Sequence, residues 1–248
     1  MNGQIHWRVW TAAGWAVIAF MLAPLVVIIL GSFTAEEFLG LPFHLSLRWY
    51  IDIANQPRFL DGFVNSLELG IATALLTTLL GASAAIALAR RLVPGADAIA
   101  LLLLLPIMVP SVIISMALLQ FFNNLHVTSP YLTLLIGHTI ITLPYVVRTV
   151  TASLNVMPKG LEWAGANLGA SPWRVVWSVV LPNILPGLIG GLIFAFVVSF
   201  DTVTVSIFLL KPSFIPLPVR LYDFIQTGVS PVLASVSTLL ILFMTAAV

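Results

Sequence analysis

One carboxylate lies deep inside an apolar stretch of this chain and is the residue best placed to do chemistry. Asp201 falls within an apolar run at about 183–209, flanked by Ser199, Phe200 and Thr202. A carboxylate at membrane depth costs several kcal/mol unless it faces water or a partner, and it attracts cations. The pattern therefore predicts that these four residues line a pathway for a small solute. The alternative is a structural role for Asp201, as the cap of a helix break or the partner of Arg220.

His138 is the second polar residue predicted at this depth. It lies in an apolar run at about 132–152, where a neutral imidazole forms hydrogen bonds without carrying a charge. We place it in the predicted pathway, with a purely structural role as the alternative. The histidines do not follow the i, i+4 spacing of metal ligands and cysteine is absent, so no metal site is predicted. No nucleophile motif predicts a catalytic residue either.

A more polar stretch, from Glu162 to Pro182, contains the start and stop signals of two short helices. Glu162 falls in a first helical turn, where the helix dipole favours a carboxylate. Gly169 stands where a C-terminal cap requires a left-handed residue. Ser171 is a good N-cap, and Pro172 suits the first helical position. Pro182 is predicted to stop or kink the second helix.

The spacing in this stretch resembles the EAA cytoplasmic loop of ABC-transporter permeases from bacterial importers. Five positions match that motif: Glu162, Ala164, Gly169, Leu181 and Pro182. Trp163 replaces the usual second alanine, and Val179 replaces an isoleucine. The resemblance implies that a separate ATPase subunit is coupled through Glu162, Trp163, Ala164, Gly169, Ala170, Ser171, Leu181 and Pro182. The alternative is an ordinary connection between two helices.

Composition places the whole chain in a membrane. Of its 248 residues, 60% are hydrophobic and 8% charged, whereas a soluble domain has about 25% charged residues. The chain is therefore expected to be an all-α, polytopic membrane protein with one permease domain over residues 1–248. Six spans of the length that crosses a bilayer are predicted, the second capped by Asn65. They cover about 10–31, 65–89, 98–122, 132–152, 183–209 and 231–248.

The distribution of basic residues predicts the orientation. Arginine and lysine are concentrated on one side of the predicted spans, at Arg8, Arg90, Arg91, Arg148, Lys159 and Arg174. Because cytoplasmic loops carry such an excess, the N-terminus and the loop 153–182 are predicted to be cytoplasmic. With the EAA resemblance, this topology implies the type I ABC importer fold in a bacterial inner membrane, the loop serving as the coupling helix.

The resemblance also implies what this chain leaves to its partners. It has no Gly-x-x-x-x-Gly-Lys-Ser/Thr loop, so we expect no cofactor on this chain and no enzyme activity. ATP and Mg²⁺ are expected on a partner ATPase dimer. The resemblance also implies a second homologous permease subunit that forms a heterodimer with this chain; a homodimer is the alternative. A periplasmic solute-binding protein is the third implied partner. A net charge of +1 argues against nucleic acid as a partner.

Three stretches resemble the PotC-type permeases of spermidine/putrescine importers: 199–201, 211–222 and 228–231. A polyamine is therefore the solute that the resemblance favours. Thr202, however, holds a place where those permeases tend to carry a second aspartate. One charge instead of two leaves γ-aminobutyrate, an opine, an aminoalkylphosphonate or another small solute as alternatives. A secondary transporter or channel would be expected to show inverted repeats and more ion-coordinating carboxylates.

Overall fold

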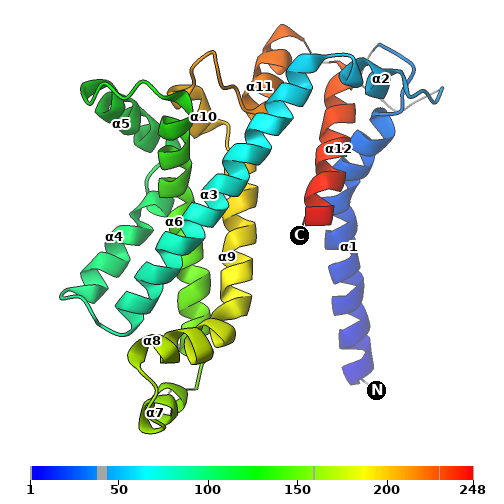
Figure 1. The fold of residues 1–248 in the computed structure, drawn as a ribbon. Helices are drawn as coiled ribbons and strands as arrows, with labels where there is room; N and C mark the ends of the chain where they lie inside the picture. Colours follow the sequence, from blue (N-terminus) through cyan, green and yellow to red (C-terminus); the bar gives the residue numbers. More distant parts are fainter. Residues whose placement is uncertain (1, 38–43, 159, 229, 248) are drawn as a thin grey trace. The chain divides into compact units, whose positions relative to one another are not determined.

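The protein is all-helical in the part of the chain that the structure describes (Figure 1). The computed structural model describes residues 2–37, 44–158, 160–228 and 230–247. Extended pairing in these ranges is limited to two isolated β-bridges, Thr34 with Leu45 and Lys211 with Phe214. The predicted all-α class is confirmed. Lys159, one of the basic residues used for the orientation, lies outside the described residues.

Four helical segments in the described residues are long and apolar enough to cross a membrane. They are α1 (Asn2–Gly31), α3 (Pro57–Ala89), α6 (Pro130–Val156) and the continuous segment Pro172–Asp201. The bent pair α4 (Ala96–Met108) and α5 (Ser111–Asn124) makes a fifth if it counts as one span. The last helix, α12 (Pro231–Ala247), is apolar but shorter. The division into six spans stays a prediction.

The expected span at 98–122 is not one straight helix. Helix α4 ends at Met108 and α5 begins at Ser111, and the pair is bent by 105°. Val109 between them is extended, with φ −91° and ψ 132°. The cause is Pro110, because the residue before a proline is sterically disfavoured in the α region. Pro106, by contrast, stays inside α4.

The prediction that Asn65 caps the second span is wrong. Helix α3 already begins at Pro57, a residue whose fixed φ suits a first helical turn. Asn65 instead donates its side-chain amide to the Ile215 carbonyl at 3.2 Å. Ser66 accepts a hydrogen bond from the backbone N–H of Leu217 at 2.8 Å. Both polar side chains therefore fasten α3 to the chain that precedes α11 (Leu217–Thr227).

The chain forms two compact units, Met1–Leu60 with Leu221–Val248, and Asp61–Arg220. In the first unit, α1 and α2 (Arg48–Ala54) both pack against α12. The Ser235 hydroxyl of α12 donates to the Ser32 carbonyl at 3.1 Å, and the hydroxyls of Ser32 and Tyr50 lie 2.6 Å apart. Most of α1 carries apolar side chains that this unit leaves exposed.

The second unit is built around α6 and α9 (Leu181–Asp201), which run side by side, and α3, which crosses them obliquely (Figure 1). Glycines let α9 approach α6 closely, since a Cβ on Gly191 would stand 3.2 Å from the Cα of Val146. A buried hydrogen bond of 2.9 Å joins Thr77 of α3 to Thr142 of α6. The core between these helices contains mainly small and branched side chains: Ala74, Ala82, Ala85, Val146, Val150, Ile184 and Ala195.

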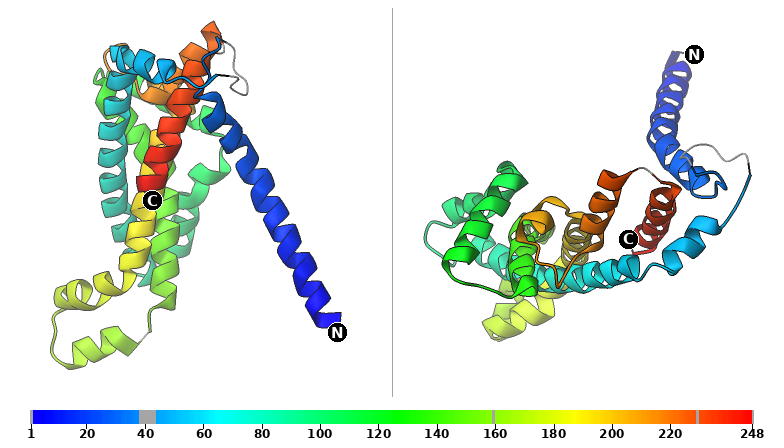
Figure 2. Two further views of the ribbon diagram at one scale, coloured as in Figure 1. Left: turned by 90° about the vertical axis from the view of Figure 1, so that its right-hand side faces the viewer. Right: turned by 90° about the horizontal axis from the view of Figure 1, so that it is seen from above.

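The long helices of this unit are interrupted at both of its ends. Near one end, α7 (Gly160–Asn167) and α8 (Pro172–Val175) lie where α6 ends and α9 begins (Figures 1 and 2). At the other end, the predicted span 183–209 is interrupted, because α9 ends at Asp201 and α10 runs from Thr204 to Leu209. Thr202 between them is extended.

Of the two outcomes predicted for Pro182, a stop or a kink of the helix, the structure excludes the stop. The chain stays helical from Pro172 to Asp201, with a π-helical turn at Val176–Val180 between α8 and α9. A π-helical turn is a wider turn with altered hydrogen bonding, and here it directly precedes the segment that holds the proline. Pro182 comes just after this turn, so its missing N–H falls where the regular hydrogen-bond pattern is already interrupted.

Candidate functional site

The loop after α6 folds as the two short helices that its sequence predicts. Glu162 lies in the first turn of α7, and α7 ends at Asn167. Gly169 has φ +81°, the left-handed conformation expected of a C-terminal cap. Its N–H donates to the Ala166 carbonyl at 2.9 Å, and the N–H of Ala170 reaches the Gly165 carbonyl at 3.1 Å. These bonds satisfy carbonyls that the end of the helix would otherwise leave unpaired.

The start of α8 also follows the prediction. Ser171 is its N-cap and accepts a hydrogen bond from the backbone N–H of Arg174 at 3.4 Å. Pro172 occupies the first helical turn. The caps in the sequence therefore set where α7 ends and where α8 begins, before any packing is considered.

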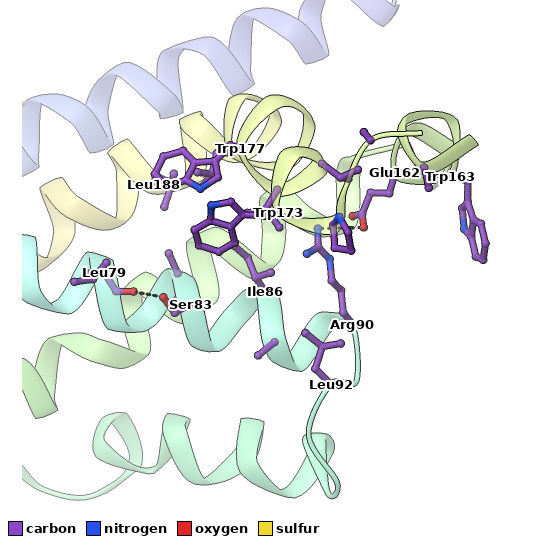
Figure 3. A pocket seen from close by; sticks show the side chains of 18 of the residues that line it. Leu79, Ser83, Ile86, Arg90, Leu92, Glu162, Trp163, Trp173, Trp177 and Leu188 are labelled. Carbon is purple, nitrogen blue, oxygen red and sulfur yellow. Dashed lines mark hydrogen bonds and ion pairs between the residues drawn. The ribbon is translucent and has the colours of Figure 1, made fainter. Parts of the chain in front are cut away.

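An ion pair within the chain fixes the position of Glu162. Its Oε2 lies 3.1 Å from Nη2 of Arg90, which follows the last turn of α3 (Figure 3). Both side chains are largely shielded, with 22% of Arg90 and 32% of Glu162 exposed. Although the two charges are in contact, Nε and Nη2 of Arg90 are buried without a well-aligned hydrogen-bond acceptor. Sequence reasoning used Arg90 only as a cytoplasmic marker and missed this contact.

A cavity of about 940 Å³ lies beside this ion pair, between the end of α3 and the loop helices. Trp173 and Trp177 meet edge to face beside it, with ring centroids 5.9 Å apart (Figure 3). Trp163 is 74% exposed and points away from the ion pair. Of the other predicted coupling residues, Ala170 and Leu181 line the cavity, while Ala164, Ser171 and Pro182 are exposed.

A second cavity, of about 670 Å³, lies at the break between α9 and α10. Asp201 and Thr202 line it, together with Thr204 and the bend between α4 and α5 at Pro110. Asp201 is exposed, so its carboxylate is accessible to a solute in this cavity. Of the predicted pathway residues, the structure thus places Asp201 and Thr202 on the same cavity wall.

The ion pairs recorded among the described residues do not include Asp201 with Arg220. Arg220 lies instead against α3, where its Cδ would be 3.0 Å from a Cβ on Gly62. Its Nε is buried without a hydrogen-bond partner. The structural alternative that paired these two residues therefore has no support. Asp201 does stand at a helix break, as the other alternative expected, but the capping positions are Thr202 for α9 and Val203 for α10.

The remaining predicted pathway residues lie behind the cavity wall. His138 is fully buried, and its Nδ1 and Nε2 lie 2.8 Å and 3.1 Å from the hydroxyls of Ser199 and Ser206. Because Ser199 belongs to α9 and Ser206 to α10, His138 spans the break next to Asp201. Phe200 is buried as well, and its ring meets that of Phe63 of α3 edge to face at 5.9 Å.

Tyr145 is a cavity residue that sequence reasoning missed. It is half-buried in α6, lines the same cavity as Asp201, and stacks on Phe194 with ring centroids 6.4 Å apart. An aromatic face and a carboxylate together attract a cation in a confined site. The only signal in the sequence was its place beside Pro144 in an apolar run, which does not tell which side chains face a cavity.

Comparison with known families agrees with this architecture. Residues 78–248 match the family described as the inner membrane component of binding-protein-dependent transport systems. The match covers more than half of the chain, including the loop helices and both cavities. The chain belongs to this family. It is thus a transport permease subunit and a multi-pass inner-membrane protein, and its family implies ATPase and binding-protein partners.

Several relatives of this permease carry substrate names. The spermidine/putrescine transport system permease protein PotC of Escherichia coli (strain K12) is 29% identical over 227 residues, 91% of this chain and 86% of the relative. The putrescine permease protein PotI of the same strain is 26% identical over 229 residues, 90% of this chain and 82% of the relative. In fold, the chain resembles a bacterial ABC transporter that imports alginate. That likeness has a TM-score of 0.71 at 14% identity and covers 98% of this chain and 92% of the other.

Proposed function

We propose that this permease forms half of the translocation pathway of an ATP-driven importer for small amine-containing solutes, with spermidine or putrescine foremost. The observation that carries the proposal is the exposed carboxylate of Asp201 in a cavity that also contains Tyr145. A fixed negative charge beside an aromatic ring favours a cationic amine. The names of the relatives PotC and PotI support the same class of solute.

The coupling loop is the second half of the proposal. Helix α7 and the residues Glu162, Trp163, Ala164, Gly169, Ala170, Ser171, Leu181 and Pro182 would transmit the movement of an ATPase dimer on the cytoplasmic side. Exposed Trp163 and Ala164 offer a contact surface there. The N-terminus would also be cytoplasmic, by the excess of arginine and lysine on that side. A second, similar permease chain would complete the pathway, and a periplasmic binding protein would deliver the solute.

Reconstitution tests this function directly. The complex of this chain with its partner permease, ATPase and binding protein is placed in vesicles, and uptake of radiolabelled spermidine and putrescine is measured with ATP. We expect uptake that requires ATP and the binding protein, and that excess unlabelled polyamine abolishes. Uptake of γ-aminobutyrate or an aminoalkylphosphonate in place of polyamines would overturn the solute assignment and keep the transporter class. Uptake without an ATPase would overturn the class itself.

A further inference from the structure

The coupling helix α7 is attached to the rest of its unit in two different ways. Along the chain it packs against α8 and the π-helical turn, where a Cβ on Gly165 would stand 3.3 Å from Val175. None of the described residues of α7 is buried. Away from its chain neighbours, the ion pair between Glu162 and Arg90 joins α7 to the end of α3. A helix with so little buried surface depends strongly on such a contact for its position.

The surroundings make this ion pair stronger than one on an open surface. Both side chains are mostly shielded from water, so solvent and salt screen the attraction less. Nε and Nη2 of Arg90 are buried and have no hydrogen-bond acceptor in the described structure, so the contact with Glu162 is an ion pair without an aligned hydrogen bond. Removing the carboxylate would leave a shielded cation without its partner, which is strongly unfavourable. The pair therefore resists separation when α7 is pushed or pulled.

Helix α3 carries this attachment to the cavity that holds Asp201. It is anchored in the middle by the buried hydrogen bond between Thr77 and Thr142. Towards its other end, Phe63 contacts the ring of Phe200, and a Cβ on Gly70 would stand 3.1 Å from the Phe196 ring. Phe200 directly precedes Asp201. Helix α3, continued by Arg90, thus contacts both the coupling loop and the residues behind the cavity.

We propose that Arg90 is a positioning residue for coupling: through its ion pair with Glu162, it makes α3 move with α7. The inference rests on the proposed function, since it assumes that an ATPase moves α7. It adds a route to the cavity besides the covalent connections of α7 to α6 and α9. In this view Glu162 acts within this chain, because its ion pair transmits movement of the loop to α3.

The test compares charge variants in the full transporter complex. Arg90→Gln removes one charge, Glu162→Gln the other, and the double variant Arg90→Glu with Glu162→Arg exchanges them. For each assembled complex, ATPase activity is measured with and without the loaded binding protein, together with uptake of radiolabelled spermidine per ATP hydrolysed. We expect Arg90→Gln to lower the stimulation and the uptake per ATP at least about threefold. The exchange is expected to restore a substantial part of both, and Arg90→Lys to retain most of the coupling.

Arg91→Gln is the matched control. Arg91 is the next residue and pairs with Asp97 at 3.5 Å, but both side chains are exposed, at 77% and 89%. The same loss of charge there is expected to leave coupling unchanged. The proposal is wrong if the Arg90→Gln complex shows the same ATPase stimulation and the same uptake per ATP as the wild type. It is also wrong if the complex with the exchanged charges assembles but does not regain coupling. Complexes that fail to assemble with both Arg90→Gln and the exchange would also overturn it, because the pair would then serve assembly.

These outcomes are distinct from failure of the proposed function. A wild-type complex that takes up no spermidine would refute the solute assignment. The role of Arg90 could still be tested in that case, by comparing how strongly the binding protein stimulates the ATPase activity of wild-type and variant complexes. A chain that assembles with no ATPase would refute the proposed function before any variant is compared.

Discussion

Gly187 of α9 lies directly against the backbone of α6 at Thr149. A Cβ on Gly187 would stand 2.7 Å from the Thr149 carbonyl oxygen and would also meet the side chain of Ser153. The close approach of these two helices therefore requires a residue without a side chain at this point. The same two helices connect the proposed coupling loop to the Asp201 cavity.

Gly187→Ala is accordingly expected to destabilise the purified chain by about 1–3 kcal/mol, because the added methyl group meets backbone that cannot rotate away. The melting temperature in detergent measures the effect. Gly190→Ala is the matched control on the same helix, where an added Cβ meets nothing within 4 Å. That variant is expected to be neutral or slightly more stable, as alanine is the better helix former. Equal melting temperatures for both variants would contradict the packing described here.

Ser199→Ala tests whether His138 holds α9 and α10 together. The change removes the hydroxyl 2.8 Å from His138 Nδ1 and leaves that buried nitrogen without this partner. Its expected cost is about 1–3 kcal/mol, measured as a lower melting temperature. Ser83→Ala is the control, since that exposed hydroxyl bonds only within its own helix, to the Leu79 carbonyl. Unchanged stability with lower solute uptake would instead support the predicted contact of His138 and Ser199 with the solute.

Asp201→Asn is expected to lower uptake of a cationic amine about tenfold or more, because the attraction of a fixed charge in a confined cavity is lost while size is kept. Assembly and the affinity of the binding protein for its solute are expected to stay unchanged. Asp97→Asn makes the same chemical change at an exposed residue 89% accessible to solvent, and serves as the control. Normal uptake by the Asp201 variant would remove this residue from the pathway.

Gly169→Val is expected to uncouple the ATPase while the membrane helices stay folded. At φ +81° a β-branched residue is strained, although the surrounding space is open. The signature is loss of transport with basal ATPase activity retained or altered. Gly169→Asn, which tolerates this conformation better, is expected to recover part of the transport. Gly190→Val is the control at a glycine outside the loop that has no positive φ and open space around it. Full transport by Gly169→Val would mean that the loop is only a connector.

Features that depend on local chemistry could be predicted from the residues alone. The apolar composition placed the chain in a membrane, and the caps at Gly169 and Ser171 set the ends of α7 and α8. Such signals act over a few residues of backbone, so they can be read without knowing what packs where. The same local reasoning applies to the bend at Pro110. Because Pro106 and Pro110 lie in one apolar run, however, the sequence does not show at which of them the helix breaks.

Which side chains meet depends on how the helices pack, and the sequence does not show this. The pairing of Arg90 with Glu162 joins residues 72 positions apart, and the contact of His138 with Ser199 joins residues separated by 61. Asn65 looked like a helix cap in the sequence but reaches Ile215 in the fold. In uniformly apolar helices, hydrophobic periodicity does not show which face is inside. Helix packing therefore set the wall of the Asp201 cavity, and it alone brought Tyr145 to that wall.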